Sequence, residues 1–151
     1  MRSLIPAALA AAAVLALPPV AAADTASATA KIAGSTVSVG NPVLAKVNLH
    51  TKFSSIDSVC FQFTFAGDLL DPGELLRITP LQLLPSEAGP GIQNVSSAPQ
   101  AERTLCIDSS SSVAGVFSDG KEKDLELAIQ TGTSGSVNIA SLVVTVTGTT
   151  R

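Results

Sequence analysis

The sequence has no tryptophan, no tyrosine and a single histidine, His50, and charged residues make up 14% of its 151 positions. Aromatic residues amount to 3%, all of them phenylalanine. Nine basic and twelve acidic residues give a net charge of −3, with no basic cluster, whereas nucleic-acid binding needs a cationic surface. The composition argues against nucleic acid as a partner. It also removes the Trp and Tyr platforms that sugar clefts use.

Hydrophobic residues are concentrated at the start of the chain, where they fill 18 of the first 23 positions. A short positive start precedes an apolar run over residues 4–17, and three alanines precede Asp24. This order is typical of a secretory signal peptide, and the run is shorter than the roughly 20 residues that span a bilayer. We predict that residues 1–23 are a signal peptide cleaved after Ala23. The Ala-rich leader indicates a bacterial protein that is secreted or periplasmic.

The chain beyond the leader is about 40% hydrophobic, which is ordinary for one globular domain. It has no second apolar run of spanning length, so we do not expect an integral membrane protein after leader removal. Its two cysteines are Cys60 and Cys106, and they lack the Cys-x-x-Cys spacing of a redox site. In an oxidising compartment such a pair most often forms a structural bridge. We predict one disulfide between them.

Apolar and polar residues alternate with a period of two in segment after segment. This alternation is typical of half-buried antiparallel strands, and no segment has the 3.6-residue period of an amphipathic helix. The clearest segments are residues 43–50, 59–65, 104–108, 125–130 and 137–146. We therefore predict an all-β fold, an antiparallel β-sandwich of jelly-roll or immunoglobulin-like type with about 8–9 strands.

The predicted sandwich covers residues 35–147. Residues 24–34 precede it as a loose N-terminal extension or a weak first strand, and residues 148–151 follow as a short tail. The apolar positions change parity within residues 137–146, which indicates a bulge near residues 140–141 or a strand buried on both faces. Both cysteines alternate with the apolar rows of their own strands, so the disulfide is expected on the outer surface of the sandwich.

Three stretches carry turn and loop signals. Asp71-Pro72-Gly73-Glu74 has the order of a helix N-terminus and predicts one short helical turn near residues 72–76. Asp119-Gly120 predicts a tight turn that joins residues 113–117 and 124–129 in a hairpin. Residues 85–102 contain three prolines and predict a long loop.

Catalytic equipment is scarce in this sequence. His50 alternates with Val47 and Leu49 and is interpreted as a solvent-facing residue at a strand end. No Gly-x-Ser-x-Gly nucleophile elbow is present, and one histidine with two bridged cysteines leaves too few ligands for zinc. We predict no catalytic residue and no enzymatic activity.

Carboxylates gather at two places in the sequence. Asp68, Asp71 and Glu74 surround the predicted helical turn, and Asp119 and Asp124 flank the predicted hairpin turn. Calcium accepts loop carboxylates, so these five residues are the candidates for a metal site, although neither group has an established calcium-loop spacing. A capping box at the first place and a solvated turn at the second are the competing interpretations. We predict no cofactor unless one of these groups binds calcium.

Some segments resemble the cohesin family and its carbohydrate-binding-module relatives, which are jelly-roll sandwiches. A Gly/Pro-marked strand lies at residues 39–43, an alternating strand at 61–65 leads to an Asp-Pro turn at 71–75, and a closing strand follows at 137–146. The resemblance covers about residues 37–147 and implies a jelly-roll fold and a recognition function. The tyrosine usual before the Asp-Pro turn is absent, two extra residues intervene and a cysteine pair is added. No binding residue is carried over.

The start of the mature chain is similar to the donor strand of chaperone–usher pilus subunits, which are secreted and complete a neighbour's sheet with an N-terminal strand. Small or apolar residues alternate there at Ala26, Ala28, Ala30 and Ile32. The cysteines fall later in the chain than in such subunits.

The sequence predicts a secreted, non-enzymatic β-sandwich module that recognises a protein or an extracellular surface, glycans included. The candidate surfaces are a sheet face and the loop over residues 85–102. The alternatives are a structural subunit of a pilus-like surface assembly and a small secreted sandwich enzyme.

Overall fold

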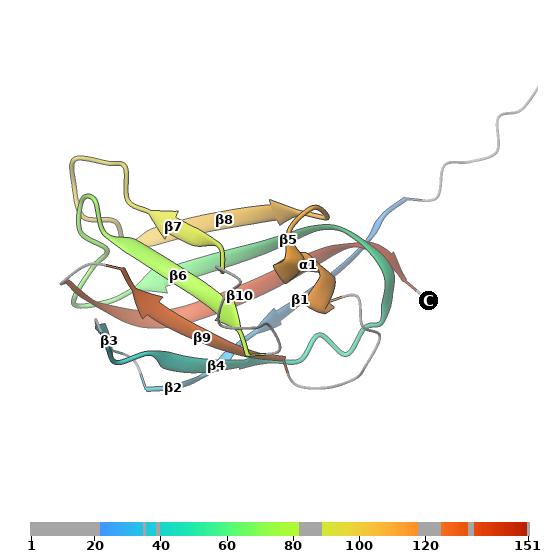
Figure 1. Ribbon diagram of the computed structural model, residues 1–151, viewed down its shortest axis with the longest axis horizontal. Helices are drawn as coiled ribbons and strands as arrows, with labels where there is room; N and C mark the ends of the chain where they lie inside the picture. Colours follow the sequence, from blue (N-terminus) through green and yellow to red (C-terminus); the bar gives the residue numbers. More distant parts are fainter. Residues whose placement is uncertain are drawn as a thin grey trace, which may run out of the picture.

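The computed structural model describes residues 22–34, 36–38, 40–81, 89–117, 125–132 and 135–150. All but the last two residues of the predicted signal peptide lie outside these ranges. The described residues form two antiparallel sheets of five strands each, packed face to face, and one short helix, α1 (Ser112–Phe117) (Figure 1). The all-β antiparallel sandwich is thus confirmed. Its ten described strands exceed the predicted 8–9, because short segments at the sheet edges also pair.

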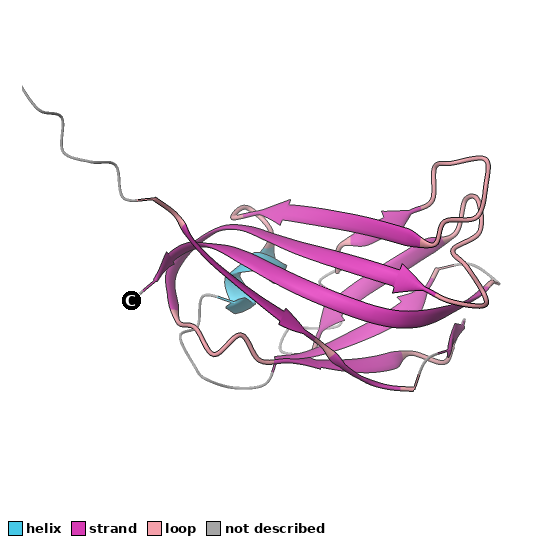
Figure 2. Ribbon diagram, turned by 180° about the vertical axis from the view of Figure 1, so that it is seen from behind, coloured by secondary structure: helices cyan, strands magenta, loops and turns pink. Residues whose placement is uncertain are grey.

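The first sheet, called the disulfide sheet, has the strand order β1-β10-β5-β8, and β3 pairs with the beginning of β10. Its members are β1 (Asp24–Thr29), β3 (Thr36–Ser38), β5 (Phe53–Phe65), β8 (Glu102–Asp108) and β10 (Ser136–Thr150). Figure 2 shows this sheet in front, with its long strands side by side. Strands far apart in the sequence are therefore neighbours in this sheet.

The second sheet has the order β2-β4-β9-β6-β7. Its members are β2 (Lys31–Ala33), β4 (Val43–Val47), β6 (Leu75–Pro80), β7 (Gly91–Gln93) and β9 (Leu125–Thr131). Burial alternates strictly along β4, so Val43, Ala45 and Val47 face the core while Leu44 and Lys46 face outward. The period-two pattern of this segment therefore predicted correctly which of its residues face the core.

The core lies between the sheets and is built from the inward rows that alternation predicted. Its fully buried residues include Phe61 and Phe63 of β5 and Leu142, Val144 and Val146 of β10. Phe63 and Phe65 stack with ring centroids 5.9 Å apart. The phenylalanines on β5 are therefore core residues and leave no aromatic platform for a ligand on the surface of this strand.

The segment after residue 23 belongs to the sandwich rather than preceding it. β1 pairs with β10 in the disulfide sheet, and β2 pairs with β4 in the second sheet. Ala30, between them, is buried and its N–H donates to the carbonyl of Leu142 over 2.8 Å. The strand alternative for residues 24–34 is thus the observed one, and this segment links the two sheets along one side. The last strand likewise continues to Thr150, past the predicted end at residue 147.

Of the two alternatives for the last strand, the bulge is the observed one. The register of β10 against β5 shifts between Ile139 and Ser141, which restores the inward row at Leu142. A second shift occurs between Thr147 and Gly148, where the strands approach closely. A Cβ at Gly148 would lie 2.1 Å from the carbonyl oxygen of Ser55, so only glycine fits there.

The helical turn predicted near residues 72–76 is wrong. The carbonyl of Asp71 accepts a hydrogen bond from the N–H of Glu74 over 3.0 Å, and Gly73 between them has a φ of 79°. Proline at the second position and a left-handed glycine at the third are the features of a type II turn. This turn leads directly into β6, so the acidic and proline signals marked a reversal of the chain and not a helix.

The strand predicted over residues 113–117 is also wrong, because α1 occupies this segment. Ser111 precedes the helix, and its Oγ accepts the N–H of Val113 over 3.3 Å, as an N-cap does. Val113, Ala114 and Phe117 are buried, and Phe117 packs edge-on against Phe61 with centroids 6.2 Å apart. The predicted Asp119-Gly120 turn lies outside the described residues.

Candidate functional site

The outer face of the disulfide sheet is the surface that the fold builds most regularly. Over the central parts of β1, β10, β5 and β8, between the bulges, every second residue points away from the core. The strand register aligns these residues in rows that cross the sheet. The three central rows are Thr25–Thr147–Ser58–Asp108, Ser27–Thr145–Cys60–Cys106 and Thr29–Val143–Gln62–Thr104.

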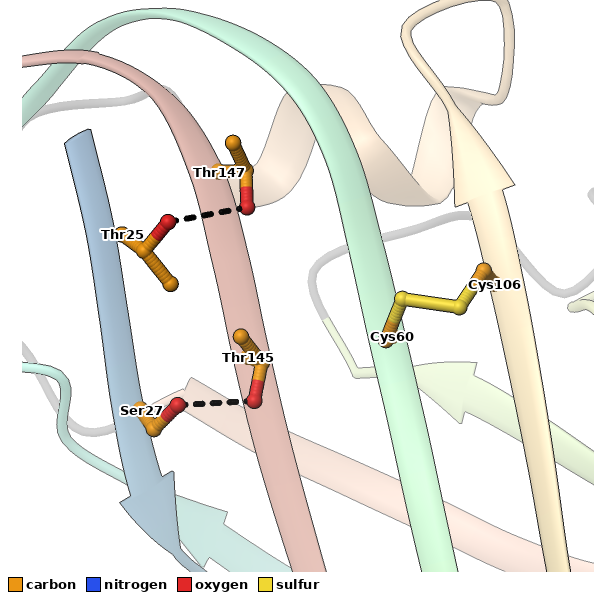
Figure 3. Close-up of a disulfide and its surroundings, with 6 residues drawn as sticks. All are labelled: Thr25, Ser27, Cys60, Cys106, Thr145 and Thr147. Carbon is orange, nitrogen blue, oxygen red and sulfur yellow. Dashed lines mark hydrogen bonds between the residues drawn. A yellow bond between two sulfur atoms is a disulfide. The ribbon is translucent and has the colours of Figure 1, made fainter. Parts of the chain in front are cut away.

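The eleven residues of these rows other than Asp108, which stands at the β8 end of the first row, are uncharged and are called the hydroxyl face. Hydroxyl groups hydrogen-bond across the strands: Thr25 Oγ1 lies 3.3 Å from Thr147 Oγ1, and Ser27 Oγ lies 2.7 Å from Thr145 Oγ1 (Figure 3). Such cross-strand Thr and Ser pairs stabilise a sheet and hold each hydroxyl in one orientation. The surface therefore offers a patterned array of donors and acceptors.

The predicted disulfide is present and lies within the hydroxyl face. Cys60 of β5 and Cys106 of β8 are directly opposite each other, and their sulfur atoms are bonded (Figure 3). Cys60 is half-buried and Cys106 is exposed, as expected for an outward bridge. The disulfide fixes the edge strand β8 to the centre of the sheet at this row.

Charged residues border the hydroxyl face. Glu102 and Asp108 stand at the two ends of β8 on the same face. Ser110 donates to the Asp108 carboxylate from its hydroxyl and from its backbone N–H, and these hydrogen bonds lower the pKa of Asp108. At the other edge, Thr150 does the same for Asp24 and lowers the pKa of that carboxyl.

The outer face of the second sheet is different in character. Lys46 of β4 and Glu126 of β9 form an ion pair there with a nitrogen–oxygen distance of 3.1 Å, and Arg77 of β6 is exposed on the register row of Gln130. Exposed pairs of this kind are typical of a solvated surface. The uncharged array is thus a property of one sheet and not of the fold as a whole.

Two of the three predicted metal ligands that the structure describes line the same recess. Asp68 and Asp71 line a recess of about 330 Å³, where Asp68 Oδ2 accepts a hydrogen bond from Ser136 Oγ over 3.3 Å. Glu74 is only 5% exposed, and its carboxylate lies so close to Gly135 that a Cβ on that glycine would be 2.3 Å from Oε2. Within the described ranges, no three His, Cys, Asp or Glu residues are close enough to hold a metal ion.

Asp119 and Asp124, the other candidates, lie outside the described residues. His50 lies in the connection between β4 and β5, is exposed and has a φ of 52°. Its N–H donates to Asn48 Oδ1 over 2.9 Å, which stabilises this left-handed turn. The position of His50 is explained by the turn.

The loop predicted over residues 85–102 is partly ordered into strand. β7 lies within it and pairs with β6, while residues 82–88 are outside the described part. Asn94 is buried and its Nδ2 donates to the carbonyls of Leu70 and Ala98 over 2.8 and 3.0 Å. This network ties the loop to the turn before β6, so Asn94 is a structural residue here.

In the part of the chain that the structure describes, no helix has the length and apolarity needed to cross a membrane.

No protein-family model and no curated protein matches the chain. Among solved structures, the fold is similar to the crystal structure of FlhE with a TM-score of 0.48 and 12% sequence identity, over 85% of this chain and 99% of that one. A likeness of this degree assigns neither a family nor a function to the chain.

Proposed function

We propose that the protein is a secreted, non-enzymatic recognition module that binds a protein or an extracellular surface through the hydroxyl face. The observation that carries this proposal is the array of eleven uncharged side chains in the three cross-strand rows, with Asp108 at the edge of the first row. Its hydroxyl and amide side chains donate and accept hydrogen bonds and are themselves neutral, so they do not select a charged partner. The partner therefore presents neutral hydrogen-bonding groups, such as the hydroxyl or amide groups of a glycan or a protein surface.

Two further features support this use of the face. The Cys60–Cys106 bridge and the hydroxyl pairs hold the array in one arrangement, and a preorganised surface loses less entropy when it binds. The disulfide also fits the predicted export to an oxidising compartment. The hydroxyl face has no aromatic residue, so affinity would come from many hydrogen bonds over a broad area and not from stacking in a cleft.

The experiment compares two lysine substitutions at matched glutamines. Gln62 is exposed at the centre of the hydroxyl face, on β5, and Gln130 is exposed on β9, a central strand of the second sheet. The immobilised protein is exposed to the secreted fraction of its source organism and, separately, to insoluble neutral polysaccharides. We expect Gln62→Lys to reduce retention of the bound component at least about tenfold, because an unpaired charge must be desolvated in the interface.

Gln130→Lys is the control and should retain the same component as the unaltered protein. Thermal unfolding of both variants establishes that they are folded. Equal retention by Gln62→Lys and the unaltered protein would refute binding through the hydroxyl face, and loss in Gln130→Lys alone would place the binding surface on the second sheet.

A further inference from the structure

The outer edge of β1 is the least protected strand edge of the described molecule. The N–H of Ala30 donates to Leu142, and the register continues from this pair to Ala28 and Ala26, which also exchange hydrogen bonds with β10. In an antiparallel ladder the intervening residues direct their backbone groups to the other side. The N–H and C=O groups of residues 25, 27 and 29 therefore point away from the sheet.

The other edges of the described sheets carry the usual protection against pairing. β2, β3 and β7 are only three residues long. β8 has Glu102 and Asp108 at its ends, and Arg103 Nη2 donates across to the carbonyl of Gln93 in β7 over 2.9 Å. β1 has six residues, with no proline, no bulge and no charge between Asp24 and the next element.

We propose that β1 pairs in antiparallel fashion with β1 of a second copy of this chain, so that the two disulfide sheets become one. The hydrogen bonds require that outward-pointing residues face each other. With Ser27 opposite Ser27 of the second copy, Thr25 faces Thr29 at both ends, and all three outward residues of each strand are paired. The strand is thus complementary to itself about a two-fold axis at Ser27.

The charges at the two ends of this edge select the antiparallel direction and the second copy as occupant. Asp24 begins β1, and Lys31 follows it after Ala30 at the start of β2; both charged residues are exposed. In the proposed register Asp24 of one copy comes opposite Ala30 of the other, next to its Lys31. Each end of the pairing then combines Asp24 of one copy with Lys31 of the other, whereas parallel pairing would place Asp24 near Asp24 and Lys31 near Lys31.

The pairing has two consequences for the molecule. Thr25, Ser27 and Thr29 belong to the hydroxyl face, so their hydroxyl rows continue into the second copy and the face doubles in width. A two-fold interface occupies the β1 edge of both copies, so no β1 edge is left to bind a third copy. The assembly is a dimer, unlike the open polymer that a strand donated from subunit to subunit would build.

Sedimentation equilibrium over a concentration series tests the dimer with Ser27→Pro. Proline removes an N–H that points outward and leaves the β1–β10 hydrogen bonds of Ala26 and Ala28 in place. The matched control is Thr104→Pro on β8. The N–H of Thr104 also points away from its partner strand, because the N–H of Phe65 donates to the carbonyl of Ala101 and the alternation continues from there. We expect a dimer for the unaltered protein and for Thr104→Pro, and a monomer for Ser27→Pro.

A charge exchange tests the register without proline. Asp24→Lys and Lys31→Asp each place like charges together and should raise the dimer dissociation constant about three- to tenfold, since exposed pairs contribute modestly and two are reversed. The double variant should restore the dissociation constant of the unaltered protein, although this variant also lacks the Asp24–Thr150 contact.

Three results would overturn the proposal. They are a monomeric unaltered protein at every concentration, a dimer that Ser27→Pro leaves intact while it remains folded, and equal disruption by Thr104→Pro, which would indicate β1–β8 pairing. A double variant no tighter than the single ones would overturn the register.

Discussion

Asp24 shows how a single carboxylate anchors the beginning of β1 to the end of β10. Its Oδ2 accepts hydrogen bonds from Thr150 Oγ1 and, over 3.2 Å, from the Thr150 N–H, and these lower its pKa below the ordinary value of 3.8. A lowered pKa in the folded state means that the contact stabilises the fold above the ordinary value and is lost as the pH falls through the lowered one. The contact thus holds at neutral pH and is lost at a pH below the ordinary value of 3.8.

Thr150→Val tests this assignment, because it removes the hydroxyl donor and leaves the backbone donor. We expect the pKa of Asp24 to rise toward 3.8, as followed by the carboxyl carbon resonance in an NMR titration. Asp108 is the internal control, since Ser110 lowers its pKa independently. An unchanged Asp24 titration, or an equal change at Asp108, would show that the Thr150 hydroxyl is not the cause.

At the scale of the element, alternation along a strand also decides which way a cysteine of that strand points. Phe61 and Phe63 point inward, so Cys60 points outward, and the sequence sufficed to predict a surface disulfide. The parity change before Leu142 likewise indicated a bulge as one of two alternatives, and the bulge is the one observed. Periodicity is local information, and these features depend only on local parity.

The elements that were predicted wrongly depend on information that is not local. Residues 113–117 form a short apolar run, and periodicity over so few residues does not distinguish a strand from a helix. The packing of Phe117 on Phe61 and the N-cap at Ser111 favour the helix α1 over a strand. The hydroxyl face also depends on non-local information. Alternation predicts that its residues point outward, but only the strand order brings residues of four strands onto one face.

Removal of the disulfide gives a prediction for the β5–β8 pair. Replacing both cysteines by alanine releases a bridge between residues separated by 46 positions, and the chain-entropy model gives a loss of about 4 kcal/mol in the free energy of unfolding. Urea denaturation measures this loss. The reduced, unaltered protein should show a similar loss, which separates the bridge from the cost of the alanines. A loss below about 1 kcal/mol would mean that the unfolded chain is already constrained in this region.

At the scale of the whole molecule, the segment formed by β1 and β2 connects the two sheets along one side. β1 lies on the disulfide sheet, Ala30 is buried at the crossing, and β2 lies on the second sheet (Figure 1). The opposite side is linked by the side chain of Arg103, which bridges β8 and β7. The residues that follow the predicted cleavage site are therefore part of the sandwich. They are not a dispensable N-terminal extension.

Deletion of residues 24–33 tests this role against a chain that begins at Asp24. We expect the free energy of unfolding to fall by at least about 3 kcal/mol, because several strand hydrogen bonds are lost and each contributes about 1 kcal/mol. The deletion also exposes the edge of β10, whose inward residues Leu142, Val144 and Val146 are fully buried, so light scattering should detect aggregation. A synthetic peptide of residues 24–33 should restore both properties by occupying the vacant edge. Equal stability of the two chains would show that β1 and β2 only rest on the sandwich, and it would leave the segment free to pair with another subunit.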